Sequence, residues 1–164
     1  MAGDILSEAH PIEKTPKSRL LQYIYIKGEY EDYREELTRL ENNAIIPAMR
    51  ESDGSKRNPG ASDRMGNATI RYMEYKAEVE PKTARLKAEM NAINAAIDSL
   101  NDSLERQVLR LRYIQGDDGG IRDQMPWKKV ALRIYKTVDD AKEQAVHRIH
   151  GRALQHIRLE DPEE

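Results

Sequence analysis

Three of the four histidines in this chain stand in one short segment near the C-terminus, AVHRIHGRALQHIR, residues 145–158, together with three arginines. His147 and His150 are three residues apart, a spacing at which two imidazoles on one helix could share a metal ion. The chain contains no cysteine, and the same helical face offers no acidic residue as a third ligand. The segment therefore favours histidines that face solvent or a partner, and we expect neither a metal nor another cofactor.

A catalytic interpretation of the same segment is also weak. Glu143 and His147 are four residues apart and could form an acid–base pair. Catalysis would further require a nucleophile or groups that stabilise an oxyanion, and no such arrangement accompanies the pair. We interpret it as a contact on a helix surface and do not expect an enzyme.

The segment has two faces if it is helical. Apolar residues recur at three- and four-residue spacing and must face inward: Val146, Ile149, Ala153 and Ile157, with Leu154 beside them. The residues left outward or lateral are mostly cations and amides: Gln144, His147, Arg148, Gly151, Arg152 and Gln155. Such a face can lie in the major groove of DNA, contact phosphates and reach base edges. Gly151 costs about 1 kcal/mol of helix propensity relative to alanine, a cost that close approach of another backbone would explain.

The charge is distributed unevenly. The whole chain has a net charge of −2, which does not indicate a nucleic-acid binder. Residues 127–158, in contrast, hold eight Lys and Arg against three acids, a local balance of +5. Near a polyanion the charged forms of His147 and His150 are favoured, so DNA binding should strengthen as the pH falls toward about 6.

Composition favours long helices. Of the 164 residues, 38% are hydrophobic and 34% charged, and there is no phenylalanine, a mixture more typical of helical seams than of a bulky core. The absence of cysteine fits a reducing cytosol. There is no apolar leader and no run that approaches a membrane span. We expect a soluble, cytoplasmic protein that does not bind a membrane.

Two long helical seams precede the histidine-rich segment. The first runs through residues 17 to about 49 with heptad spacing: Tyr23, Ile26, Tyr30, Tyr33, Leu37, Leu40 and Ala44. Pro47 and a loop-forming stretch should break it, and a second helical region should begin near Asp63 and be ended or kinked by Pro81. Beyond Pro81 the second seam continues: Leu86, Met90, Ile93, Ile97, Leu100 and Leu104. We predict an all-α protein whose residues 17–100 form an antiparallel, coiled-coil-like hairpin with a loop near 50–62. The seams could close within one chain or across a dimer.

Three shorter helices follow. The first, LERQVLRLRYIQG, should start near Ser103, end at Gly116 and turn apolar residues inward: Leu104, Val108, Leu111 and Ile114. A loop, DDGGIRDQM, precedes the second helix, PWKKVALRI, in whose first turn Pro126 is well placed. Trp127 should pack between these two helices rather than stack on a base. With the basic third helix they outline a helix-turn-helix unit over 101–159, between an N-terminal tail, 1–16, and an acidic tail, 160–164.

The three short helices resemble a known family. LERQVLRLRYIQG, MPWKKVALRI and AVHRIHGRAL are similar to region four of bacterial sigma factors, and more so to the small sigma-region-four-like proteins of phages and prophages, which include the ArpU-like regulators of phage late genes. The resemblance covers about residues 100 to 158. It implies a transcription regulator in a bacterial cytoplasm that binds double-stranded promoter DNA, with RNA polymerase and a second copy of the chain as candidate further partners.

The resemblance also implies residue roles. The third helix would enter the major groove and contact bases through four residues: Glu143, Gln144, His147 and Arg148. Four cations would approach the DNA backbone: Lys128, Lys129, Lys142 and Arg152. The chain departs from the family at YKTVDDAKEQA, which is several residues longer than expected, so either the connecting turn is enlarged or the third helix gains an N-terminal turn.

Two other functions remain open. A small-terminase-like DNA-packaging protein also combines a helix-turn-helix with helical oligomerisation segments, although its DNA-binding unit usually comes first; a ring of subunits would favour it. A helical protein-interaction module without DNA binding is the other, and absence of salt-sensitive DNA binding would favour that one.

Overall fold

The computed structural model describes residues 15–50, 61–116 and 124–159, with the side chains of 46–50 and 61–65 left out. The described part is all-α and has no strand, as the sequence predicts. Its elements are α1 (Pro16–Arg50), α2 (Ala61–Asp98), α3 (Ser103–Leu109), the π-helical η2 (Arg110–Gln115), α4 (Trp127–Tyr135) and α5 (Asp140–His156). Four predicted features fall largely outside these residues: the tail 1–16, the loop near 50–62, most of the loop before α4, and the acidic tail 160–164.

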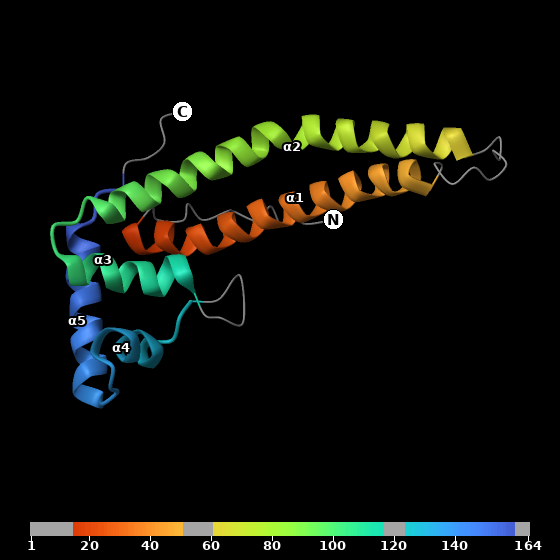
Figure 1. Ribbon diagram of the computed structural model, residues 1–164. Coiled ribbons are helices and arrows are strands. Elements are labelled where there is room, and N and C mark those ends of the chain that lie inside the picture. Colours follow the sequence, from red (N-terminus) through yellow and green to blue (C-terminus); the bar gives the residue numbers. More distant parts are fainter. Residues whose placement is uncertain (1–14, 51–60, 117–123, 160–164) are drawn as a thin grey trace, which may run out of the picture.

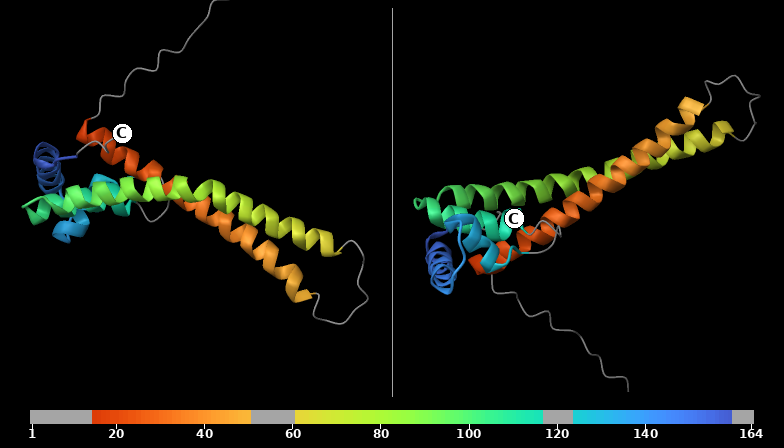
Figure 2. Two further views of the ribbon diagram at one scale, coloured as in Figure 1. Left: turned by 90° about the horizontal axis from the view of Figure 1, so that it is seen from above. Right: turned by 60° about the horizontal axis from the view of Figure 1, so that its bottom comes forward.

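The two long helices α1 and α2 run in opposite directions side by side and cross when seen from above (Figures 1 and 2). Both predicted seams lie at this contact. On α1, Tyr23 and Ile26 are buried and the later seam residues are half-buried; on α2, Ile93 and Ile97 are buried. The amide of Asn94 on α2 donates to the Tyr23 hydroxyl across the contact, 3.3 Å away. Each long helix therefore buries its own apolar stripe against the other.

Neither proline ends a long helix. α1 continues past Pro47 to Arg50, and α2 passes through Pro81 without interruption. A proline inside a helix removes one backbone hydrogen bond and crowds the preceding turn, which bends the helix. The axis of α2 indeed changes direction near its middle (Figure 1). Val79 is buried just before this point, and the Lys82 ammonium lies over the Tyr33 ring of α1 just after it. Packing on both sides of Pro81 keeps α2 continuous. Of the two outcomes that we predicted for Pro81, an end or a kink, the kink is therefore the correct one.

The shorter helices begin and end at local signals. The Asp102 side chain accepts a hydrogen bond from the backbone N–H of Leu104 and starts α3, while Gly116, with φ of 66°, follows η2. Pro126 is the N-cap of α4, one residue before the first turn in which we expected it. Only residues 136–139 connect α4 to α5, whose N-cap is Asp139. The connection itself is therefore short, and residues 140–145 form the first turns of α5.

Two buried clusters hold the elements together. The first joins the adjoining ends of the long helices to α3, η2 and the C-terminal half of α5: Leu20, Tyr23, Ile93, Ile97, Leu100, Leu109, Tyr113, Ala153 and Ile157. The second joins α3, η2, α4 and the N-terminal half of α5: Val108, Leu111, Met125, Val130, Ala131, Val146 and Ile149. α5 belongs to both clusters and runs across the end of the α1–α2 pair (Figure 1). The N-terminal half of α5 and the whole of α4 extend beyond that pair.

One predicted core residue of α3 is misplaced. Leu104 is 38% exposed, whereas its neighbour Glu105 is buried. The inward stripe of α3 runs through Glu105, Val108 and Leu109, and one residue of helix turns the side chain by about 100°. Leu104 consequently points away from the stripe, and a carboxylate takes the inner place that we assigned to leucine.

Candidate nucleic-acid interface

The outer face of α5 carries the polar residues predicted for it. All six are exposed along one side of the helix: Gln144, His147, Arg148, Gly151, Arg152 and Gln155. Glu143 lies at the flank of this face and is half-buried. The inward stripe of Val146, Ile149, Ala153 and Ile157 is buried as the spacing predicts. We call the six exposed residues the α5 outer face.

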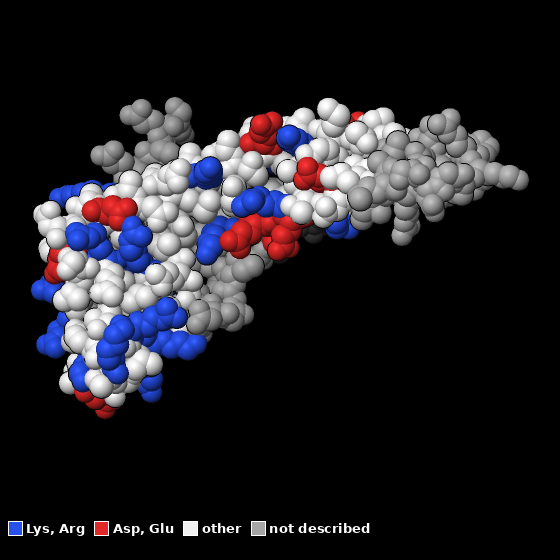
Figure 3. Space-filling view, in the orientation of Figure 1, with Lys and Arg blue, Asp and Glu red and all other residues white. Residues whose placement is uncertain are grey.

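Two further cations stand on α4, which packs against α5. Lys128 and Lys129 are exposed in the first turn of α4, which begins without a side-chain hydrogen bond to its N-terminal N–H groups. Lys and Arg side chains cover much of the lower part of the molecule, which α4 and α5 form, while acids there are few (Figure 3). Both the helix dipole of α4 and these side chains favour an anionic partner.

Lys142 has a local role. Its ammonium donates to the Thr137 hydroxyl and lies 3.2 Å from Oδ2 of Asp139. Asp139 also caps α5, and the Lys142 backbone N–H bonded to its carboxylate holds the pKa of that group below its ordinary value. Lys142 thus stabilises the connection between α4 and α5, and a phosphate would have to compete for its ammonium.

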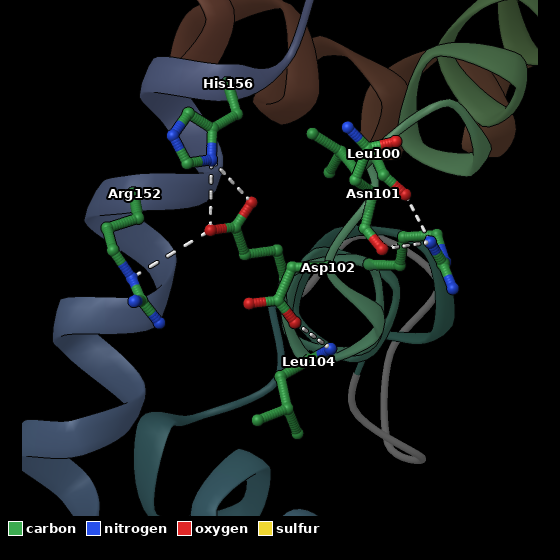
Figure 4. Close-up of polar contacts among 8 residues, drawn as sticks. Leu100, Asn101, Asp102, Leu104, Arg152 and His156 are labelled. Carbon is green, nitrogen blue, oxygen red and sulfur yellow. Dashed lines mark hydrogen bonds and ion pairs between the residues drawn. The ribbon is translucent and has the colours of Figure 1, made fainter.

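A buried carboxylate links α3 to α5. Glu105, with 3% of its side chain exposed, accepts from Nδ1 of His156, which lies 2.9 and 3.1 Å from its two oxygens. The Arg152 Nε is 3.9 Å from the same carboxylate. Arg152 and His156 point toward this group from α5, as the dashed lines show (Figure 4). His156 thus gives the buried carboxylate a hydrogen-bond partner and Arg152 lies within ion-pair distance of it, so Arg152 supports the fold besides facing outward.

Sequence reasoning missed Glu105 because an acid in the first turn of a helix is ordinarily exposed. A signal was present: Glu105 stands three residues before Val108 and four before Leu109, both of which are buried. A charged residue in an inward position of an amphipathic helix is informative, since it needs a partner from another element.

Trp127 lies where the three short helices meet. Its ring centroid is 4.4 Å from that of His147 and 4.8 Å from that of His150, both on α5. The guanidinium of Arg112, on η2, lies 4.3 Å from the indole centroid. Trp127 therefore packs against the first short helix (α3 with η2), as expected, and also against α5. One consequence is that the exposed His147 ring has an aromatic neighbour on its inner side.

His150 is an interior residue, and the expectation that it faces DNA is wrong. It is 8% exposed, and its Nε2 lies 2.8 Å from the Tyr113 hydroxyl. Burial, together with the nearby charges of Arg112 and Lys17, lowers the pKa of His150 from 6.5 to about 4. Because it stands one residue after Ile149 and four after Val146, it belongs to the inward stripe. His150 therefore cannot supply the pH dependence of DNA binding that we expected from it.

Among the residues that the structure describes, no three His, Asp or Glu side chains converge as metal ligands would. None of the helices in those ranges has a stretch long and apolar enough to cross a membrane.

No protein-family model, curated protein or solved structure gives a significant match to this chain. Functional inference therefore rests on the geometry and charge of the chain's own residues.

Proposed function

We propose that this protein is a transcription regulator that binds promoter DNA by placing α5 in the major groove. In this proposal α3 with η2, α4 and α5 form a sigma-region-four-like helix-turn-helix, and α1 and α2 form the hairpin that carries it. The observation that supports the proposal best is the α5 outer face, an exposed row of cations and amides beside the basic first turn of α4.

The dimensions of α5 suit a groove. Its 17 residues make a helix about 25 Å long. The outer face extends from Gln144 to Gln155, about 16 Å along the axis, which matches about five base pairs at 3.4 Å each. The four-residue connection between α4 and α5 also has the length found in helix-turn-helix units.

Charge along α5 indicates which part would contact bases. Three acids stand at its N-terminal end: Asp139, Asp140 and Glu143. Carboxylates oppose a close approach to phosphates, whereas the residues from Gln144 onward are cations and amides. We therefore assign base contacts chiefly to Gln144, His147 and Arg148, and keep Glu143 as a flanking residue able to accept from a cytosine amino group.

Regulation is favoured over packaging by the long pair of helices. The seam residues that lie on α1 and α2 are buried or half-buried within one chain, so these residues do not require a ring of subunits to cover them. A monomer or a dimer is sufficient, and RNA polymerase is a candidate partner for the projecting end of the pair.

The test begins with selection of a preferred duplex from random sequences, followed by titration at several salt concentrations. Arg148→Ala should lower affinity for the selected duplex by about 1–3 kcal/mol and relax base preference at one position. Arg71→Ala is the matched control, because Arg71 is an exposed arginine on α2, away from the proposed interface. That control should bind like the parent protein.

Two results would contradict the proposal. If the parent protein shows no salt-sensitive DNA binding, an interaction module becomes the better hypothesis. If Arg148→Ala and Arg71→Ala bind equally well, α5 is not the helix that recognises the sequence.

A further inference from the structure

Gly151 lies inside a helix and has no structural reason to be glycine. Its φ is not in the left-handed region, where Gly116 is found. A Cβ built on Gly151 would meet nothing within 4 Å. Glycine inside a helix nevertheless lowers stability relative to alanine, because its backbone loses more freedom on folding. Neither backbone conformation nor packing within the described chain explains this residue.

The surroundings of Gly151 are polar and exposed. His147 and Arg148 precede it by one helical turn, and Gln155 follows it by one turn, all on the α5 outer face. The His147 ring packs against the Trp127 ring on its inner side. Side chains that can donate hydrogen bonds therefore surround Gly151, where the helix presents only its backbone.

We propose that Gly151 is the point of closest contact between α5 and the edges of the base pairs, an inference that rests on the proposed function. A helix with side chains is about 10–12 Å wide and the major groove is about 12 Å wide, so a residue at the centre of the inserted face limits the depth of insertion. Histidine and glutamine side chains are shorter than arginine. They reach base edges only if the helix axis lies deep in the groove, which the missing Cβ permits.

The experiment compares Gly151→Ala with Gly66→Ala. Gly66 is an ideal control, because it also lies inside a helix, α2, and a Cβ there would also meet nothing within 4 Å. Both substitutions should raise the melting temperature, since both replace a helical glycine without a clash. Only Gly151→Ala should weaken binding to the selected duplex, by about tenfold, with nonspecific binding retained. Gly151→Leu should weaken specific binding further.

The alternative outcomes are distinct. Unchanged specific affinity of Gly151→Ala, with normal binding by the parent, overturns this inference and leaves the proposed function in place. An equal loss of specific and nonspecific affinity overturns the base-edge contact, because it places phosphates over Gly151. A lower melting temperature for Gly151→Ala shows that the fold itself needs glycine and also overturns the inference. A parent protein that binds no DNA overturns both proposals.

Discussion

Acid should destabilise this fold through His150. The buried imidazole is neutral in the folded protein because its pKa is lowered to about 4, whereas in the unfolded chain it has its ordinary value of 6.5. Between these values the unfolded chain binds a proton that the folded protein does not bind. The contribution of His150 to stability is thus complete above pH 6.5 and is lost as the pH falls toward 4.

The size of this effect follows from the two pKa values. At 1.36 kcal/mol for each unit, protonation of His150 in the unfolded chain should remove about 2 kcal/mol from the free energy of unfolding by pH 5. The loss should reach about 3 kcal/mol by pH 4, a large part of the 5–15 kcal/mol typical of a domain.

Urea unfolding followed by circular dichroism at several pH values measures this loss. His150→Gln is the informative variant, because an amide can keep a hydrogen bond to the Tyr113 hydroxyl but does not titrate. The parent should lose about 2 kcal/mol more than His150→Gln between pH 7 and pH 5. His147→Gln, at an exposed histidine, is the control and should keep the parent's dependence. Equal losses in the parent and His150→Gln would refute the assignment of a buried, neutral His150.

Two further substitutions test the packing of the short helices. Glu105→Gln keeps the shape but removes the charge that His156 and Arg152 contact, so urea unfolding should show a loss of about 1 kcal/mol; an unchanged value would mean that the carboxylate contributes nothing. Lys136 ends α4 in the left-handed conformation, with φ of 63°. Lys136→Gly should therefore raise the free energy of unfolding by about 1 kcal/mol in thermal melts, and a decrease would show that the lysine side chain makes contacts that outweigh its backbone cost.

Periodicity and capping residues were enough to predict most elements. The seam through Tyr23 and Ile26 is buried, and so is the inward stripe of α5 from Val146 to Ile157. α3 starts at Ser103, as expected, after the cap Asp102. These features depend on residues at most a few positions apart, and such local preferences operate in any tertiary context.

The prediction failed where the answer depends on what packs against a residue. Pro47 does not itself end α1, which stops at Arg50, close to the end predicted near residue 49. Pro81 kinks α2 without ending it, a choice the sequence left open. Leu104 and Glu105 exchange their expected places, because α5 brings donors to the inner side of α3. Spacing gave a signal for Glu105, but which residues meet it and how far each helix continues depend on the elements packed around them.

For the candidate site, the sequence by itself determined which residues share the outer face of α5, since a 3.6-residue period separates polar from apolar positions once the segment is helical. Only the tertiary structure decided that His150 is buried beside Tyr113 while His147 is exposed beside Trp127. His150 belongs to the apolar stripe by its spacing and His147 lies at the edge of that stripe, but how far each is covered is set by where η2 and α4 lie against α5. That placement arises from the two buried clusters. The first draws members from Leu20 to Ile157 and the second from Val108 to Ile149, so they come from separate helices that meet only when the chain folds.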